Sequence, residues 1–261
     1  MSTMDKVSPC LNQGLSAVIL VNVCYEGKYA ITYYDLDMFG HLKLSALLRM
    51  VHIAADYNAT ELGAGYNTLL EAGMAFVLQR FSVRCLRMPK YKEEVTIRTW
   101  PAAADRILFL RRGDMCDTAG NKLTEWASHW ILFDVNNRKI LKTSALPTQL
   151  SLFEDNNINI LPEKILVPPG REIDSYDYIV RYSDMDSNKH MNNAIYGDVA
   201  ANAVFDCNVG NAMPWREFHI NYTAEAKPNE KITVSTVQDA DCYYAVGKIE
   251  DKTSFTSRVV R

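Results

Sequence analysis

The sequence predicts an α+β fold built from two tandem modules, each a curved antiparallel sheet wrapped around a central helix. A short polar motif occurs twice, 149 residues apart, in Tyr34–Leu42 and Ser183–Met191. Each copy runs directly into an Ala-rich amphipathic stretch, and several strand-like runs follow each stretch. One helix followed by a set of strands excludes a doubly wound parallel sheet, which needs alternating strands and helices.

The first module is expected to start with a strand over Tyr29–Tyr34 that leads into the first motif. Apolar residues then recur at helical spacing from Leu44 to Ala55, which predicts a helix with one apolar stripe. Gly63 and Gly65 are expected to end this helix. Turn signals separate the runs that follow. These runs predict strands at residues 76–83, 94–100, 107–112 and 123–133.

The second module repeats this order from a strand over Tyr178–Tyr182. The predicted helix buries residues between Met191 and Val204 and carries Asn192 and Asn193 in its first turn, where Asn is well tolerated. Strands are expected at 217–226, 231–238, 242–249 and 255–260. The proline-rich segment 147–171 has no clear periodicity and is interpreted as a surface linker. The predicted organisation is a module at 1–146, this linker, and a module at 172–261.

The composition indicates a globular protein without attraction to polyanions. Of 261 residues, 48% are hydrophobic and 23% charged, and the formal net charge is −3. This charge gives no general affinity for nucleic acid or anionic membranes. The N-terminal residues lack a basic region followed by an apolar core, so neither export nor a membrane anchor is expected. Six cysteines without C-x-x-C pairing indicate reduced thiols and a cytoplasmic location.

Polar residues alternate in the second motif, at Asp184, Asp186, Asn188 and His190. Alternate side chains of an extended segment share a face, so these groups are expected to converge. The helix that follows presents unpaired backbone amides, which stabilise negative charge. Carboxylates, an amide, an imidazole and a helix start together are the parts needed to hydrolyse an acyl bond.

The first motif keeps the acids and the histidine but not the amide. Asp35, Asp37 and His41 match the second copy, whereas Phe39 stands where the second copy has Asn188. A structural role is the better interpretation for the first copy. The protein is therefore expected to have a single active site, in the second module.

A calcium loop is the competing interpretation of D-x-D-x-N, and the sequence excludes it. Such a loop requires Gly at its sixth position and Glu at its twelfth. Counted from Asp184, these positions hold Lys189 and Ile195; counted from Asp35, Gly40 fits but Ala46 does not. No metal and no cofactor are expected.

The string D-x-D-x-N-x-H-[VM]-N-N that begins at Asp184, with Tyr196 behind it, resembles the signature of acyl-acyl-carrier-protein thioesterases, which are double hotdog enzymes of plants and bacteria. The resemblance covers the whole chain, and the segment Ile220–Glu225 resembles the family strand that delivers a catalytic glutamate. Plant relatives commonly have Cys after this glutamate, whereas Ala226 stands here. The resemblance places four residues at catalytic positions: Asp186, Asn188, His190 and Glu225.

The resemblance implies hydrolysis of fatty acyl-acyl-carrier-protein (acyl-ACP) to free fatty acid, which terminates fatty acid elongation. Without a thiol at Ala226, a mechanism of carboxylate and water is expected. Asp186 is expected to act as general base or as nucleophile through an anhydride. Asn188 and helix amides would hold the oxyanion, His190 would orient Asp186 or water, and Glu225 would position or deprotonate the water.

The acyl chain needs an apolar tunnel, which is expected in the first module because its polar site is incomplete. Residues available there are Met50, Met74, Phe76, Leu78 and Phe81, although core packing explains them equally well. The expected partner is acyl carrier protein with its acylated phosphopantetheine arm. An acidic carrier predicts a basic docking patch. Candidates for it are Arg80, Arg84, Arg87, Lys90, Lys92, Arg111, Arg112, Arg181 and Lys189.

Three alternatives remain open from the sequence. An acyl-CoA thioesterase would share the scaffold and the chemistry but not the carrier. A hydroxyacyl dehydratase also uses a histidine and a carboxylate, but the combination of Asn188 and Glu225 argues against it. A non-catalytic acyl-binding module is the third. Because fused modules supply their own pairing, a monomer or a homodimer is expected.

Overall fold

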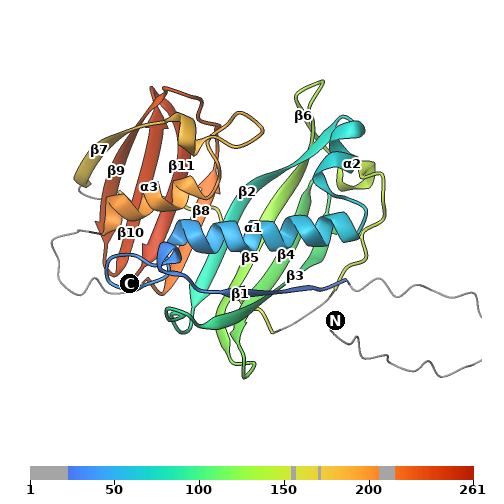
Figure 1. The fold of residues 1–261 in the computed structure, drawn as a ribbon. Helices are drawn as coiled ribbons and strands as arrows, with labels where there is room; N and C mark the ends of the chain where they lie inside the picture. The colour runs from blue at the N-terminus through green and yellow to red at the C-terminus, as the bar shows by residue number, and fades with distance from the viewer. Residues whose placement is uncertain (1–22, 154–156, 170–171, 206–214) are drawn as a thin grey trace, which may run out of the picture.

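The computed structural model describes residues 23–153, 157–169, 172–205 and 215–261 (Figure 1). The N-terminal segment from which we predicted the absence of a leader therefore lies mostly outside the described residues, and so do residues 154–156 and 170–171 of the predicted linker. No helix in the described ranges is long and apolar enough to cross a membrane.

The first module follows the predicted order of strand, loop, helix and strands. Its elements are β1 (Tyr25–Ala30), α1 (Leu44–Glu61), α2 (Tyr66–Glu71), β2 (Met74–Cys85), β3 (Glu94–Asp105), β4 (Leu108–Asp117), β5 (Lys122–Asp134) and β6 (Lys139–Leu141). The second module repeats the order with one helix. Its elements are β7 (Glu172–Ile179), α3 (Ile195–Val204), β8 (Glu217–Tyr222), β9 (Lys231–Asp239), β10 (Cys242–Ile249) and β11 (Lys252–Val260).

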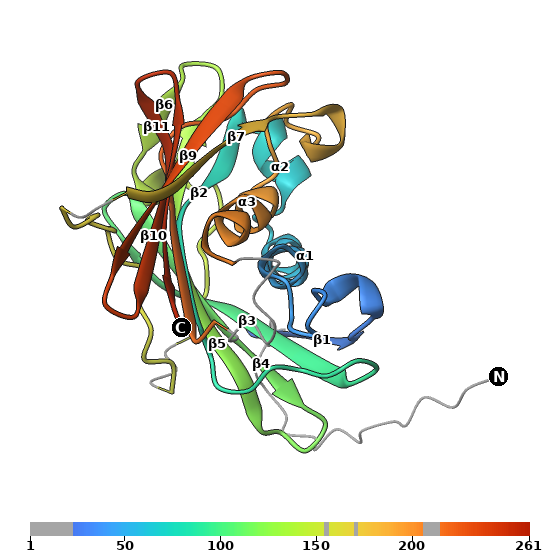
Figure 2. The same ribbon diagram turned by 90° about the vertical axis from the view of Figure 1, so that its left-hand side faces the viewer.

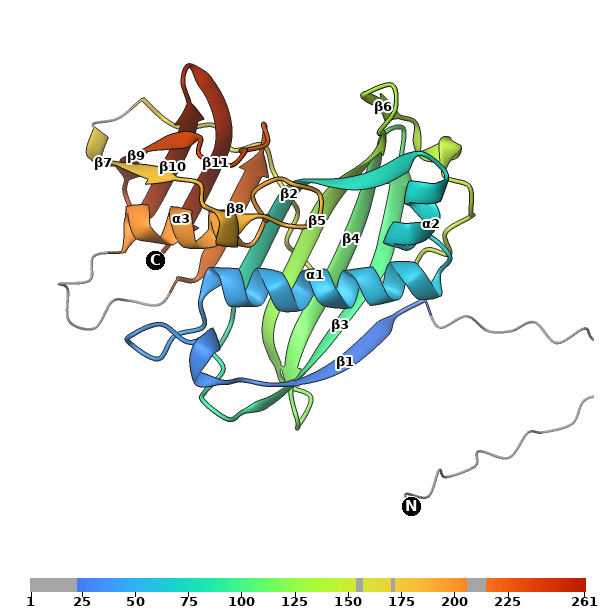
Figure 3. The ribbon, with the colours of Figure 1, turned by 45° about the horizontal axis from the view of Figure 1, so that its top comes forward.

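All strand pairs are antiparallel, and among the described residues they form one sheet of eleven strands (Figure 3). The order is β1-β3-β4-β5-β2-β8-β11-β10-β9-β7, with β6 paired to β5. The modules join where β2 pairs with β8, from Arg80 opposite Asn221 to Arg84 opposite Glu217. This pairing covers the edge that each half-sheet would otherwise expose. The predicted architecture of two like α+β modules side by side is confirmed.

The helices α1, α2 and α3 cover one face of this sheet (Figure 2). The apolar stripe of α1 faces the strands, with Leu47 and Leu48 fully buried in the main core. Full burial of a leucine stabilises the fold by roughly 1.5–3 kcal/mol. The helix ends at Glu61, and Gly63 follows in the left-handed region with φ 73°, as predicted from glycine's freedom there.

The two long helices approach each other closely at Gly197 in α3. A Cβ atom at this position would lie 3.0 Å from Leu48 Cδ1 and 3.2 Å from the Ser45 backbone nitrogen. The small residue therefore permits α3 to pack against the start of α1. This contact belongs to the same core cluster that extends across both modules.

Two predictions about the second module and the linker were wrong. The strand before the second motif is Glu172–Ile179, not Tyr178–Tyr182, because Tyr182–Asp184 forms a 3₁₀ turn. The linker is not wholly a surface segment. Ile158 and Ile160 are buried against Trp100, on the sheet face opposite to α1.

Candidate active site

The second motif folds into a closed turn. Isolated pairing of Met185 with Met191 closes the loop at its base. Inside it, the Asp186 backbone N–H donates to the His190 carbonyl at 2.9 Å, and the Lys189 N–H donates to the Asp186 carbonyl at 3.1 Å. Lys189 has φ 65°, a left-handed conformation that reverses the chain.

The carboxylate of Asp186 holds this turn together. Its Oδ1 accepts from the backbone N–H of Asn188 at 2.8 Å and from that of His190 at 3.4 Å. One side-chain oxygen thus fixes the backbone of both following site residues. The prediction that four alternating side chains converge assumed an extended segment. The segment is a turn, so this assumption was wrong.

Asp184 is separated from the other three residues. Its Oδ2 accepts from the Arg181 N–H at 2.8 Å, and its side chain is buried. It therefore caps the 3₁₀ turn that precedes the loop.

The helix after the motif begins later than predicted. Asn192 and Asn193 precede α3, which starts at Ile195. The Asn192 side-chain oxygen accepts from the Ala194 N–H at 2.9 Å, and the Asn193 carbonyl accepts from the Tyr222 hydroxyl at 3.1 Å. Asn192 shapes the turn into α3 through its side chain, which hydrogen-bonds a nearby backbone group, whereas Asn193 is held through its backbone carbonyl.

Glu225 reaches the loop from the neighbouring strand. It lies in the segment after β8, three residues beyond the strand end at Tyr222. Its neighbour Ala226 is fixed on both sides: the carbonyl accepts from the Met191 N–H at 2.9 Å, and the N–H donates to the Tyr196 hydroxyl at 3.2 Å. Tyr196, singled out in the motif, thus helps to position Glu225.

The anchored segment brings the glutamate onto the imidazole. Glu225 Oε2 lies 3.1 Å from His190 Nε2. The side chains are 48% and 37% exposed, respectively. The pair therefore remains open to water and to a substrate. An acid and an imidazole in hydrogen-bond contact are able to accept and pass on a proton.

Asn188 is met by a residue that the sequence analysis missed. The Tyr66 hydroxyl, at the start of α2 in the first module, donates to Asn188 Oδ1 at 3.0 Å. No signal near either residue marks this contact, because 122 residues separate the partners.

The first motif has the same turn without the reactive groups. Asp37 Oδ1 accepts from the Phe39 N–H at 2.9 Å and from the His41 N–H at 2.8 Å. The first loop is also closed by a matching pair, Leu36 with Leu42. The His41 ring has a different neighbour from its counterpart, with Nδ1 3.6 Å from Asp37 Oδ2.

The position of Glu225 can also be matched in the first module. Lys90 N–H donates to Glu93 Oε2 at 2.8 Å, and Lys227 N–H donates to Glu230 Oε2 at 2.7 Å. Two residues before these equivalent turns stand Met88 and Glu225. Met88 packs against the core. The first module therefore has apolar side chains, Phe39 and Met88, at the positions that Asn188 and Glu225 occupy in the second module.

Three of the nine predicted basic residues are engaged by other groups of the fold. Arg84 pairs with Glu125 at 2.9 Å and with Glu217 at 2.8 Å, and Arg87 pairs with acids of its own module. Arg111 lies inside the first module and donates to Asn58 Oδ1 at 2.7 Å; burial lowers its pKa to about 10. These contacts argue against a carrier-docking role for these three arginines, and the docking patch itself stays a prediction.

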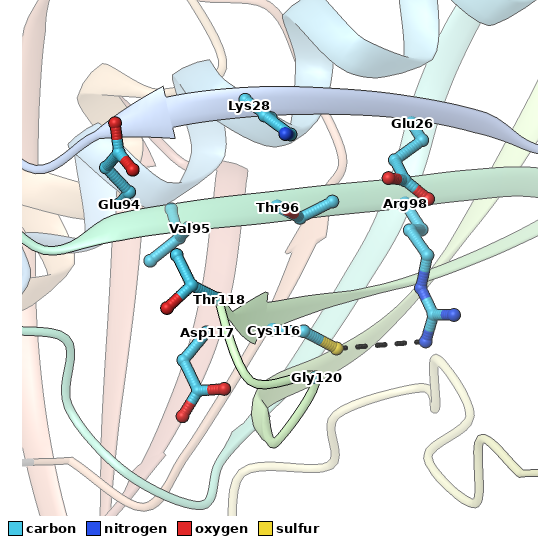
Figure 4. Close-up of a pocket in the computed structure, with 10 residues that line it drawn as sticks. All are labelled: Glu26, Lys28, Glu94, Val95, Thr96, Arg98, Cys116, Asp117, Thr118 and Gly120. Atoms are coloured by element: carbon cyan, nitrogen blue, oxygen red, sulfur yellow. Dashed lines mark hydrogen bonds between the residues drawn. The ribbon is translucent and has the colours of Figure 1, made fainter.

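Two cavities lie away from the loop. One of about 340 Å³ opens on β1, β3 and β4, with the polar side chains of Lys28, Glu94 and Arg98 around it (Figure 4). The other, of about 160 Å³, lies between the linker and His219. Of the apolar residues named for an acyl tunnel, Met50 and Phe81 pack in the main core cluster and Phe76 packs beside Phe109; the tunnel itself stays a prediction.

Comparisons with known proteins agree with this fold. Residues 22–145 match the acyl-ACP thioesterase N-terminal domain, and residues 169–259 match the acyl-ACP thioesterase C-terminal domain. A curated relative, the chloroplastic dodecanoyl-[acyl-carrier-protein] hydrolase of Cinnamomum camphora, is 26% identical over 190 residues, which are 67% of this chain and 49% of the relative. The match thus spans about half the length of that relative.

Solved structures share the whole double module. An acyl-ACP thioesterase from Bacteroides thetaiotaomicron superposes with a TM-score of 0.83 at 21% identity, over 92% of this chain and 98% of that one. The 12:0-ACP thioesterase from Umbellularia californica gives a TM-score of 0.75 at 17% identity, over 95% and 98%. These likenesses establish the double hotdog fold. With both of its modules matched in order, the chain belongs to the acyl-ACP thioesterase family.

Proposed function

We propose that this protein hydrolyses fatty acyl-ACP to free fatty acid and carrier protein, and so terminates fatty acid elongation. The observation that carries the proposal is the 3.1 Å contact of Glu225 Oε2 with His190 Nε2, on a loop that also presents Asn188. Membership of the family supports the substrate class. The curated relative, named as a hydrolase of dodecanoyl-ACP, supports it as well.

In the proposed reaction, Glu225 and His190 activate a water molecule. The water oxygen adds to the thioester carbonyl carbon while its proton passes to this pair, and the side-chain amide of Asn188 donates to the oxyanion that forms. The tetrahedral intermediate then collapses. Its C–S bond breaks, and the leaving thiolate recovers the proton, so one water and one thioester give one acid and one thiol.

For Asp186 we propose a different role from the expected base or nucleophile. Its Oδ1 is engaged by two backbone N–H groups, and it sets the positions of Asn188 and His190. We therefore propose that Glu225 acts as the general base and that Asp186 stabilises the conformation of the loop.

The second candidate function differs from the first only in the group that carries the acyl chain. An acyl-CoA thioesterase would use the same residues. Of the predicted basic residues, Arg181 and Lys189 flank the loop in sequence and are the candidates to meet an acidic carrier. We also propose a cytoplasmic location, since Cys85, Cys116 and Cys242 are free thiols, as expected in a reducing compartment.

The test compares hydrolysis of acyl-ACP and acyl-CoA of matched chain lengths by the wild type, Glu225→Gln and Asn188→Ala. Loss of one oxyanion donor is expected to lower kcat about 100- to 1,000-fold. Glu225→Gln removes the base and should lower kcat at least as much, whereas Glu61→Gln, on an exposed helix end, should not. Wild-type turnover by both site variants would remove the loop from the mechanism, and a preference for acyl-CoA would favour the second function.

A further inference from the structure

The site contains one side chain from the other module. Tyr66, the first residue of α2, donates its hydroxyl to Asn188 Oδ1 at 3.0 Å. Tyr66 belongs to the first module and Asn188 to the second, so the hydrogen bond crosses between them. The hydrogen bond is made to the side-chain amide that is proposed to donate to the oxyanion.

Packing fixes the helix that carries Tyr66, whose side chain is 43% exposed. In the same short helix, Leu69 is only 2% exposed and packs with Phe109 and Leu132. The helix also follows α1 in a tight turn: a Cβ atom on Gly65 would lie 2.9 Å from Thr60 Cα. The Tyr66 hydroxyl is therefore presented by a packed helix.

The hydrogen bond from Tyr66 selects one of the two orientations of the Asn188 amide. An asparagine side chain has one oxygen, which accepts, and one NH₂ group, which donates. Only the NH₂ group stabilises an oxyanion. A phenol donates readily but accepts poorly, because its lone pair is delocalised into the ring. Donation by Tyr66 thus favours the rotamer in which Oδ1 faces Tyr66 and the NH₂ group faces away from it.

We propose that Tyr66 is a positioning residue that selects the catalytically competent orientation of the Asn188 amide. The inference rests on the proposed function of Asn188. Asp186 holds the backbone of Asn188 through its N–H, and Tyr66 holds the side chain. Together they remove both the loop motion and the amide flip that would turn the donor away from the substrate.

The arrangement also gives the first module a part in the reaction. The modules exchange hydrogen bonds in both directions, since Trp215 of the second module donates to the Leu42 carbonyl of the first motif at 3.3 Å. Through Tyr66, the module that lacks a reactive motif completes the site of the other. A second module on its own would lack this restraint.

The test replaces Tyr66 by Phe, which removes one oxygen atom. One neutral hydrogen bond predicts a fall in kcat of about 2- to 10-fold, with KM unchanged because the ring and the substrate contacts remain. Tyr57→Phe is the matched control: this exposed tyrosine lies on α1 and stacks on Tyr25. Its kcat should equal that of the wild type.

A double-mutant cycle with Asn188→Ala identifies the route of the effect. If Tyr66 acts through Asn188, then Tyr66→Phe should lower kcat no further in the Asn188→Ala background. An equal loss in both backgrounds would overturn the proposal, as would wild-type kcat in the single variant.

A spectroscopic measurement separates this proposal from the proposed function. The side-chain NH₂ resonance of Asn188, assigned from its disappearance in Asn188→Ala, should shift in Tyr66→Phe and not in Tyr57→Phe. An unmoved resonance would overturn the contact itself. If the resonance shifts while Asn188→Ala keeps wild-type turnover, the contact exists but the proposed function of Asn188 fails, and the positioning role fails with it.

Discussion

Replacing Asp186 by Asn and by Ala distinguishes a residue that holds the loop from one that performs the chemistry. The asparagine side chain keeps an Oδ1 oxygen that can accept from the N–H groups of Asn188 and His190. Alanine removes that acceptor. We expect Asp186→Asn to keep kcat within about 5-fold of the wild type, because the loop survives. Asp186→Ala should lower kcat about 10- to 100-fold, because small misplacements of catalytic groups are costly.

The first motif supplies an internal measure of the structural part. Asp37 Oδ1 accepts from two backbone N–H groups at 2.8 and 2.9 Å, and Asp186 Oδ1 accepts from two at 2.8 and 3.4 Å. Loss of a comparable side-chain cap costs about 0.5–2 kcal/mol of unfolding free energy. Asp37→Ala and Asp186→Ala should therefore destabilise the protein by similar amounts in this range. Only Asp186→Ala should change kcat.

The assays are urea denaturation for the free energy of unfolding and saturation kinetics with acyl-ACP for kcat. Asp37→Ala controls for destabilisation, since it breaks the same turn in the module without the reactive groups. General base catalysis contributes about 100- to 10,000-fold. If Asp186→Asn lost that much turnover while it remained as stable as the wild type, Asp186 would be a base or nucleophile and our assignment would be refuted.

Two further predictions concern stability. His52 Nε2 is buried without a hydrogen-bond partner among the described residues, and burial lowers the pKa of its imidazole from 6.5 to about 4. Between these pH values the unfolded chain binds a proton that the folded chain does not, so the free energy of unfolding falls as pH falls, by at most about 3 kcal/mol. In His52→Gln, the free energy of unfolding from urea denaturation should depend less on pH between pH 6.5 and 4. The same pH dependence as in the wild type would contradict this prediction. Gly113→Ala should cost about 1–3 kcal/mol in the same assay, because its Cβ would overlap the Arg98 carbonyl oxygen and the Trp126 ring; a free energy of unfolding equal to that of the wild type would contradict this.

The fold could be predicted where its determinants are local. The stripe from Leu44 to Ala55 lies on one face of α1, and Cys242–Ile249 is a strand with the predicted bounds. The helix α2 was missed because only Leu69 of its six residues is buried, which leaves no periodic pattern to detect. The sequence predicts a surface segment for the linker because the alternation of Ile158 and Ile160 with polar neighbours is too short to stand out among its prolines and polar residues.

The site could be predicted only as far as the motif extends. Asp186, Asn188 and His190 lie within one turn, and the family resemblance supplied Glu225, which the structure brings to His190. Spacing along the chain does not reveal partners from other strands or modules. The basic residues near Arg84 therefore predict a free cation there, although it pairs with Glu125 and Glu217, and no pattern in the sequence marks Tyr66.

The duplicated motif separates scaffold from chemistry within a single chain. Asp37 makes the same turn as Asp186 in a loop that has Phe39 in place of the amide and Met88 in place of the acid, so the turn needs its aspartate whether or not a reaction takes place there. The histidine alone is no mark of activity either, since the His41 ring lies near Asp37 and Phe39, and Met88 stands at the position of Glu225. What the second module adds is a donor, Asn188, on the same loop as His190, and an acid, Glu225, against an imidazole whose backbone is already fixed. The hydrolytic assignment therefore depends on those two side chains more than on the conspicuous aspartates of the motif.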